Sequence, residues 1–265
     1  MLEQSATWAL LFFLGIFTGA VAGILGIGGG LLMVPALSVL NVPLVQATAT
    51  SLVGVFLSAV SGSVQNWRKR ALNLKAAAGL AAFGLVTAQI GAWTGDRISE
   101  SWLAFSFAAL MLLTAYFMNL KQRLKEQSSA IDLKAAGEVP ASYSLFPVAQ
   151  IGLLAGFLSG LFGVGGGAVM VPLQVLRLGE PIKSAVRTSL GAIVPIAASG
   201  LLQHTWNQNV LWIPGISLGL GGILGAQLGT RLLPRLPDRL VNQLFTLLLV
   251  LLMIYMVWKG VRAWK

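Results

Sequence analysis

Cysteine is absent from this chain of 265 residues, so neither a disulfide framework nor a thiolate metal site is available to it. Charge is also scarce, because Asp, Glu, Lys and Arg together make up 10% of the residues. Acidic residues number only 8, and the single histidine is His204. A soluble protein of this length would carry far more surface charge. These absences exclude an ordinary soluble domain, and they leave few groups for acid–base or metal catalysis.

Long apolar runs take the place of charge. No charged residue occurs from Gln4 to Trp67, similar stretches follow, and 56% of all residues are hydrophobic. One helical crossing of a bilayer needs about 20 apolar residues. The chain is therefore predicted to be an all-α polytopic membrane protein with the lipid bilayer as its partner. Its net charge of +10 is typical of Lys and Arg gathered in cytoplasmic loops, and nucleic-acid binding is not expected.

The two halves of the chain resemble each other. A shift of 137 aligns "GILGIGGGLLMVP" from Gly23 with "GLFGVGGGAVMVP" from Gly160. Chance similarity between apolar segments would match Leu, Val and Ala, whereas here the matched residues are mostly glycine and proline. We therefore expect two homologous repeats, residues 1–120 and 145–265, joined by a polar cytoplasmic linker at 121–144.

Each repeat is expected to contain four spanning helices and one short broken segment. The apolar spans lie near residues 8–27, 44–65, 72–94 and 102–120, and near 146–164, 188–203, 210–230 and 241–258. Between the first two spans of each repeat lies a short piece, Leu31–Leu40 or Ala168–Leu176, which follows a triple glycine and contains a proline. About ten residues of helix rise only ~15 Å, half of the ~30 Å hydrocarbon core. These pieces are predicted to be broken or re-entrant helices.

The distribution of basic residues favours one topology. An even number of crossings in each repeat makes the repeats parallel and places 11 of the 18 Lys and Arg residues inside. An odd number makes the repeats inverted and places 14 of them inside. The positive-inside rule favours the inverted arrangement. The parallel arrangement stays open, because the broken segments are short for a full crossing.

The triple glycines predict a substrate site, formed by Gly28, Gly29 and Gly30 with Gly165, Gly166 and Gly167. Paired, interrupted apolar segments at corresponding positions of two halves point to a transporter's binding site. The helix after each glycine run presents free N–H groups and the positive end of its dipole, which suit an anion.

Two other roles are typical of glycine-rich segments. Close packing is the favoured role for Gly19 and Gly23, and for Gly156 and Gly160, which form small-xxx-small patterns. It explains the triple glycines less well, because three consecutive residues cannot share one helix face. A dinucleotide fingerprint over residues 163–168 lacks the flanking strand and the later acidic residue that it requires.

A second shared motif supplies hydroxyl groups. Pro43 precedes Thr50 and Ser51, and Pro181 precedes Thr188 and Ser189, at a shift of 138. A proline is expected to open each following span. The four hydroxyls are candidate substrate ligands, with hydrogen bonds to the helix backbone as the alternative for each.

Polar residues outside the two shared motifs are further candidates for function. Arg187 stands where the first half has Ala49, and it could bind an oxyanion bidentately or snorkel to the interface. His204 could act as a proton relay or serve as an interfacial residue beside Trp206. Gln89 and Gln227 are expected to bond across helices. No catalytic set, metal site or cofactor motif is expected.

The duplicated G-x-G-G-G with its following Val-Pro, and then Pro…Ala…Thr-Ser, resembles the sulfite exporter TauE/SafE family of bacterial membrane transporters over essentially the whole chain. The resemblance implies a secondary transporter, not an enzyme, that exports sulfite, sulfoacetate or a related organosulfonate across the bacterial cytoplasmic (inner) membrane. We expect alternating access around the site named above. A proton-coupled importer of a similar anion and an anion channel remain alternatives, and a homodimer is possible.

Overall fold

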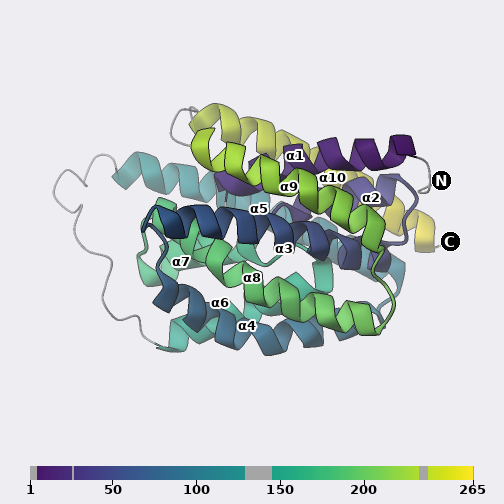
Figure 1. Cartoon of the computed structure of the whole chain (residues 1–265), viewed down its shortest axis with the longest axis horizontal. Helices are drawn as coiled ribbons and strands as arrows, with labels where there is room; N and C mark the ends of the chain where they lie inside the picture. The colour runs from purple at the N-terminus through teal and green to yellow at the C-terminus, as the bar shows by residue number, and fades with distance from the viewer. Residues whose placement is uncertain (1–4, 26, 129–144, 233–237, 265) are drawn as a thin grey trace.

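The computed structural model describes residues 5–25, 27–128, 145–232 and 238–264, and the described residues contain helices and turns but no strand. The helices form a bundle in which most of them run roughly along one direction (Figure 1). The described part of the chain forms ten helices: α1 (Ser5–Leu25), α2 (Gly30–Val39), α3 (Leu44–Arg68), α4 (Leu74–Gly95), α5 (Glu100–Ser128), α6 (Leu145–Phe162), α7 (Gly167–Leu178), α8 (Ile182–Trp206), α9 (Trp212–Leu232) and α10 (Asp238–Trp264). The all-helical prediction is confirmed for these residues.

Seven helices within the described ranges are long and apolar enough to cross a membrane. The chain is thus a multi-pass membrane protein. Helix α9 has 21 residues but is not among the seven. It contains six glycines, which lower its mean hydropathy and open its backbone to close packing.

Helices α2 and α7 are the short pieces expected from the sequence. They have 10 and 12 residues, begin at Gly30 and Gly167, and contain Pro35 and Pro172. At 1.5 Å per residue each covers about half of a hydrocarbon core. The predicted bounds of these segments are correct to within two residues.

The start of the predicted linker, residues 121–128, is helical. Helix α5 continues to Ser128, past the membrane-span candidate Glu100–Phe117, and the domain boundary at residue 120 stays a prediction. Residues 121–128 are rich in Lys, Gln, Arg, Leu and Glu, which are strong helix formers. The rest of the predicted linker, residues 129–144, lies outside the described residues.

Side-chain neighbours establish the relative directions of the helices. Helices α3 and α8 are antiparallel, because Gly200 faces Leu52 while Gly62 faces Leu190. Helices α5 and α10 are also antiparallel, since the ring of Trp102 at the start of α5 contacts that of Trp264 at the end of α10. The start of α1 and the end of α10 lie at the same end of the bundle (Figure 1).

The packing of helices α1 and α6 depends on glycine. Helix α1 packs along α9, and α6 packs along α4. A Cβ atom added to Gly19 would lie 2.5 Å from the carbonyl oxygen of Gly222, and one added to Gly160 would lie 1.9 Å from that of Ala88. Gly23 and Gly156 face the α9 and α4 backbones in the same way. The packing interpretation of these four glycines is confirmed.

Serine hydroxyls, rather than the expected glutamines, make hydrogen bonds from α3 to α9 and from α8 to α4. Ser61 on α3 donates to the carbonyl oxygen of Ile223 at 3.1 Å, and Ser199 on α8 donates to that of Leu85 at 2.7 Å. Gln89 and Gln227 are exposed. The expected cross-helix bonds of these two amides are therefore wrong, because the inward faces of α4 and α9 are formed by small residues instead.

We expect Gly160→Ala to destabilise the protein by about 1–3 kcal/mol, the usual cost of overpacking, because its new methyl group would overlap the α4 backbone. Gly62→Ala is the matched control, since its Cβ would meet only side-chain methyl groups, the Cδ1 and Cδ2 of Leu190 at 3.3 and 3.8 Å, and no backbone atom. Thermal unfolding in detergent measures both variants. Equal midpoints for the two variants would contradict the packing argument.

Candidate functional site

The two glycine runs adopt a backbone conformation that side chains disfavour. Gly28 and Gly29 have φ values of 84° and 79°, and Gly165 and Gly166 both have φ of 75°. This left-handed region strains any residue with a Cβ atom. Each run reverses the chain after a full-length helix, α1 or α6, and starts the half-length helix that follows. The glycines are therefore required by the backbone path.

The two runs meet inside the bundle. A Cβ atom on Gly30 would lie 2.1 Å from the carbonyl oxygen of Gly163, so the two loops are in backbone contact. Val55 on α3 and Ile193 on α8 lie against both Gly28 and Gly165. The sequence prediction that these glycines come together is supported by this geometry, and all of them are buried.

The N-termini of α2 and α7 converge at this contact. Their N-caps, Gly29 and Gly166, offer no side-chain acceptor. The first recorded bonds are donated by Leu32 to Gly29 and by Val169 to Gly166. The N–H groups of the first two residues of each helix therefore have no acceptor within their own helix. Two positive dipole ends thus face one buried region, which favours a negatively charged ligand.

The predicted hydroxyl ligands all have partners within the protein. Ser51 donates to the carbonyl oxygens of Gly163 at 2.9 Å and Thr48 at 2.7 Å, so it ties α3 directly to the glycine run of the other half. Thr50 accepts a bond from the N–H of Leu211 at 3.1 Å, just before α9. In this conformation the two hydroxyls hold the scaffold together, and contact with a substrate stays a prediction.

The corresponding hydroxyls of the second half bind side chains instead. Thr188 donates to a carboxylate oxygen of Glu180 at 2.9 Å, and Ser189 accepts from the amide nitrogen of Gln174 at 2.6 Å. Both hydroxyl residues are fully buried. Sequence reasoning missed Glu180 and Gln174, because neither belongs to the repeated motif.

Arg187 lies in the second turn of α8 and is half-buried. Ile193, which contacts the glycine runs, is six residues further along the helix, or about 9 Å. No ion-pair partner for Arg187 is found among the described residues. Arg187 thus lies nearer the start of α8 than Ile193 does, and its role in binding an anion stays a prediction.

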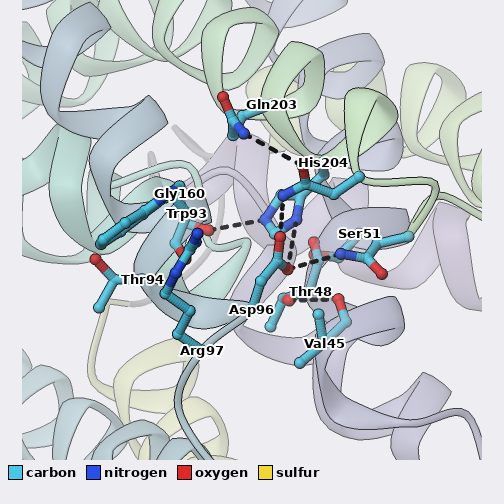
Figure 2. Close-up of polar contacts among 12 residues, drawn as sticks. Val45, Thr48, Ser51, Trp93, Thr94, Asp96, Arg97, Gly160, Gln203 and His204 are labelled. Atoms are coloured by element: carbon cyan, nitrogen blue, oxygen red, sulfur yellow. Dashed lines mark hydrogen bonds and ion pairs between the residues drawn. The ribbon is translucent and has the colours of Figure 1, made fainter.

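His204 lies in a buried polar cluster where α8 and α4 end (Figure 2). Its Nε2 donates to the carbonyl oxygen of Gly160 at 3.0 Å, and its Nδ1 lies 3.8 Å from Asp96 Oδ1. The Asp96 carboxylate also accepts from the amides of Asn207 and Asn209. His204 is therefore enclosed by protein, and its imidazole and the Asp96 carboxylate form a pair that the sequence did not suggest.

An ion pair lies at the C-terminal end of α2, away from the glycine run. The Lys259 ammonium lies 3.0 Å from Glu100 Oε1 and donates to the Ser38 hydroxyl at 2.7 Å and to the carbonyl oxygen of Val42 at 3.4 Å. Glu100 also accepts from the N–H of Leu44, at the start of α3. One lysine thus joins α10 and α5 to the chain between α2 and α3. Nothing in the sequence pattern pointed to it.

Known proteins resemble this chain over most of its length. The family model for sulfite exporter TauE/SafE matches residues 11–256. The probable membrane transporter protein YunE of Bacillus subtilis is 28% identical over 231 residues, covering 80% of this chain and 83% of that protein. A probable membrane transporter protein of Methanocaldococcus jannaschii is 28% identical over 202 residues, covering 74% and 71% of the two chains. One from Xylella fastidiosa is 28% identical over 213 residues, covering 79% and 78%. No solved structure matches significantly.

The family match covers the repeated glycine runs, both Thr-Ser pairs and nearly all the helices described above. Its members are membrane transporters and not enzymes, which agrees with the spanning helices of this structure. The chain belongs to the sulfite exporter TauE/SafE family of membrane transporters.

Proposed function

We propose that this protein is a secondary transporter that exports a small sulfur-containing oxyanion, such as sulfite, sulfoacetate or a related organosulfonate, across the bacterial inner membrane. The observation that carries the proposal is that the glycine runs which start the two half-helices, α2 and α7, meet inside the bundle. Unpaired backbone N–H groups there can bind an oxyanion without any formal positive charge. The family name supplies the sulfur chemistry of the substrate.

An inverted repeat is part of this proposal. Each main helix pair has a counterpart in which every helix is replaced by its equivalent from the other half. The pair α1–α9 corresponds to α6–α4, and the pair α3–α9 corresponds to α8–α4. Ser61 and Ile223 stand 138 residues from their counterparts Ser199 and Leu85, and both pairs make the same hydrogen bond. The equivalent helices α3 and α8 are antiparallel, as an inverted repeat requires.

The distribution of charge gives the proposed orientation. Three basic residues, Arg68, Lys69 and Arg70, lie at the end of α3 and in the turn after it. This turn is at the end of the bundle opposite the start of α1 and the end of α10 (Figure 1). With this loop inside, 14 of the 18 basic residues are cytoplasmic, in agreement with the positive-inside rule. Both chain ends are then outside.

Packing at the centre favours alternating access over a channel. The two glycine runs are in backbone contact, and Val55 and Ile193 fill the space beside them. An anion can reach the half-helix N-termini only after one half of the bundle moves relative to the other, as in transporters built from inverted repeats. The inside-negative membrane potential drives each exported negative charge by about 2.3 kcal/mol per 100 mV.

A proton-coupled mode is the second candidate, and the buried His204–Asp96 pair favours it. Histidine is the side chain whose charge changes most readily near neutral pH. We propose it as a proton relay for the same anion, so that a pH gradient distinguishes the two modes.

The topology is testable because the chain has no cysteine, so single cysteines can be introduced without a background. We expect Gln208→Cys, in the exposed turn between α8 and α9, to react with a membrane-impermeant maleimide in intact cells. Lys69→Cys, exposed in the turn after α3, should react only after permeabilisation. Labelling of both positions from the same side would contradict the proposed orientation.

The function is tested by labelled sulfite uptake into proteoliposomes containing the whole chain. We expect uptake to saturate and to fall when excess sulfoacetate is added, because both anions present a sulfur oxyanion to the same N–H groups. Uptake that rises linearly with concentration would indicate a channel. Acceleration by an imposed pH gradient would favour the proton-coupled mode. An absence of sulfite uptake by folded protein would refute the cargo assignment.

The role of the glycine runs is tested by Gly165→Ala, whose Cβ would lie 2.7 Å from Val55 Cγ1. We expect its maximal sulfite uptake to fall by roughly tenfold or more, since a strained, crowded loop would displace the half-helix N-termini. Gly179→Ala is the matched control, because Gly179 also has positive φ, 64°, but its Cβ would meet nothing within 4 Å. Equal losses in both variants would show that backbone strain alone explains the effect.

A further inference from the structure

Glu180 is a buried carboxylate that has no counter-ion among the described residues. It follows α7 by two residues, is 1% exposed, and its backbone N–H donates to the carbonyl oxygen of Gln174. Its Oε1 accepts hydrogen bonds from Ser184 at 2.7 Å and Thr188 at 2.9 Å, both on α8. Its Oε2 has no hydrogen-bond partner, and no cation pairs with it among the described residues. One carboxylate oxygen is therefore both buried and unused.

Gln174 presents a second unused oxygen on the same α7–α8 interface. Its amide nitrogen donates to the carbonyl oxygen of Met170 at 3.2 Å and to the Ser189 hydroxyl at 2.6 Å. The orientation of the amide follows from the first of these bonds, because an amide oxygen in that place would face another carbonyl oxygen. Gln174 is fully buried, and its Oε1 has no hydrogen-bond partner in the part of the chain that the structure describes.

Electrostatics makes this arrangement unfavourable when it is empty. A buried carboxylate without a paired charge is costly even when neutral hydroxyls donate to it. The C-terminal end of α7 adds a partial negative charge beside Glu180. At the other end of the bundle the corresponding end of α2 is met by the Lys259 ammonium, which bonds Ser38 and the carbonyl oxygen of Val42. The end of α7 also presents oxygen acceptors, but among the described residues no lysine ammonium binds them.

We propose that Glu180, Gln174 and the hydroxyls of Ser184 and Thr188 form a binding site for a monovalent cation, which we assign as Na⁺. Every ligand atom that these residues offer is a hard oxygen, and oxygen ligands suit alkali and alkaline-earth cations rather than transition metals. A single carboxylate balances one positive charge, whereas divalent cations are usually held by more than one. In transporters the C-terminal ends of half-helices commonly contribute to Na⁺ coordination.

The site shares residues with the candidate anion motif. Thr188 bonds Glu180, and its neighbour Ser189 bonds Gln174, so a cation that reorganises these side chains also moves two predicted anion ligands. This coupling rests on the proposed transport function. The cation site itself does not, because it is defined by the unpartnered oxygens.

Binding is measured with ²²Na⁺ on the full-length protein purified in detergent, with choline replacing Na⁺ at constant ionic strength and no anion substrate present. We expect saturable binding and a saturable rise in the thermal midpoint with Na⁺. Glu180→Gln keeps an acceptor for the two hydroxyls but removes the charge. It should weaken ²²Na⁺ binding by roughly tenfold or more, because even the loss of an outer-shell partner typically costs that much affinity. Glu100→Gln, at the opposite end of the bundle, is the control and should bind like the wild type.

A second variant guards against misfolding of the first. Gln174→Met preserves volume and removes the amide oxygen, so it should also lower Na⁺ affinity while leaving Glu180 in place. Wild-type binding by folded Glu180→Gln, or no saturable binding by the wild-type protein, would overturn the site. A thermal midpoint that rises in acid but does not respond to Na⁺ would overturn the cation site and show that the carboxylate binds a proton instead. Sulfite uptake is scored separately, so Na⁺ binding without sulfite uptake refutes the cargo and spares this site.

Discussion

The whole structure depends on the need of backbone polar groups for partners inside a bilayer. Lipid offers no hydrogen bonds, so a chain can leave the helical path at membrane depth only where protein or a cavity surrounds it. The two glycine runs satisfy this condition by packing against each other and against α3 and α8. Glycine is needed twice over, because the loops have positive φ and their backbones touch. The half-helices that begin there then expose N–H groups to a protected interior.

The same backbone design carries different chemistry in the two halves. In the first half the end of α2 is neutralised by the Lys259–Glu100 pair, whereas in the second half the end of α7 meets the buried carboxylate of Glu180. The Thr-Ser pairs differ too, since Ser51 bonds a backbone carbonyl while Ser189 bonds an amide side chain. A duplicated scaffold thus keeps its glycine-dependent geometry, and the polar groups around it are free to diverge.

Features repeated along the chain could be predicted, and contacts across it could not. The half-helices α2 and α7 were predicted to within two residues, because glycine, proline and segment length are local signals. The bond from Ser51 to Gly163 joins residues 112 positions apart, and the His204–Asp96 contact joins the ends of two helices in different halves. The burial of Glu180 could not be predicted either, because in the sequence its position after α7 is typical of an exposed turn. These groups depend on tertiary packing that composition and spacing do not encode.

The two proposed sites together constrain the transport cycle. Thr188 and Ser189 hold Glu180 and Gln174 in the present arrangement, so they can turn towards an anion at the half-helix N-termini only when those bonds break. If the anion and the proposed Na⁺ use these hydroxyls in turn, the transporter exchanges one ion for the other. Export of a monovalent anion coupled to entry of Na⁺ moves charge in the same electrical direction twice. An inside-negative potential therefore drives the exchange with about twice the 2.3 kcal/mol per 100 mV available to anion efflux alone.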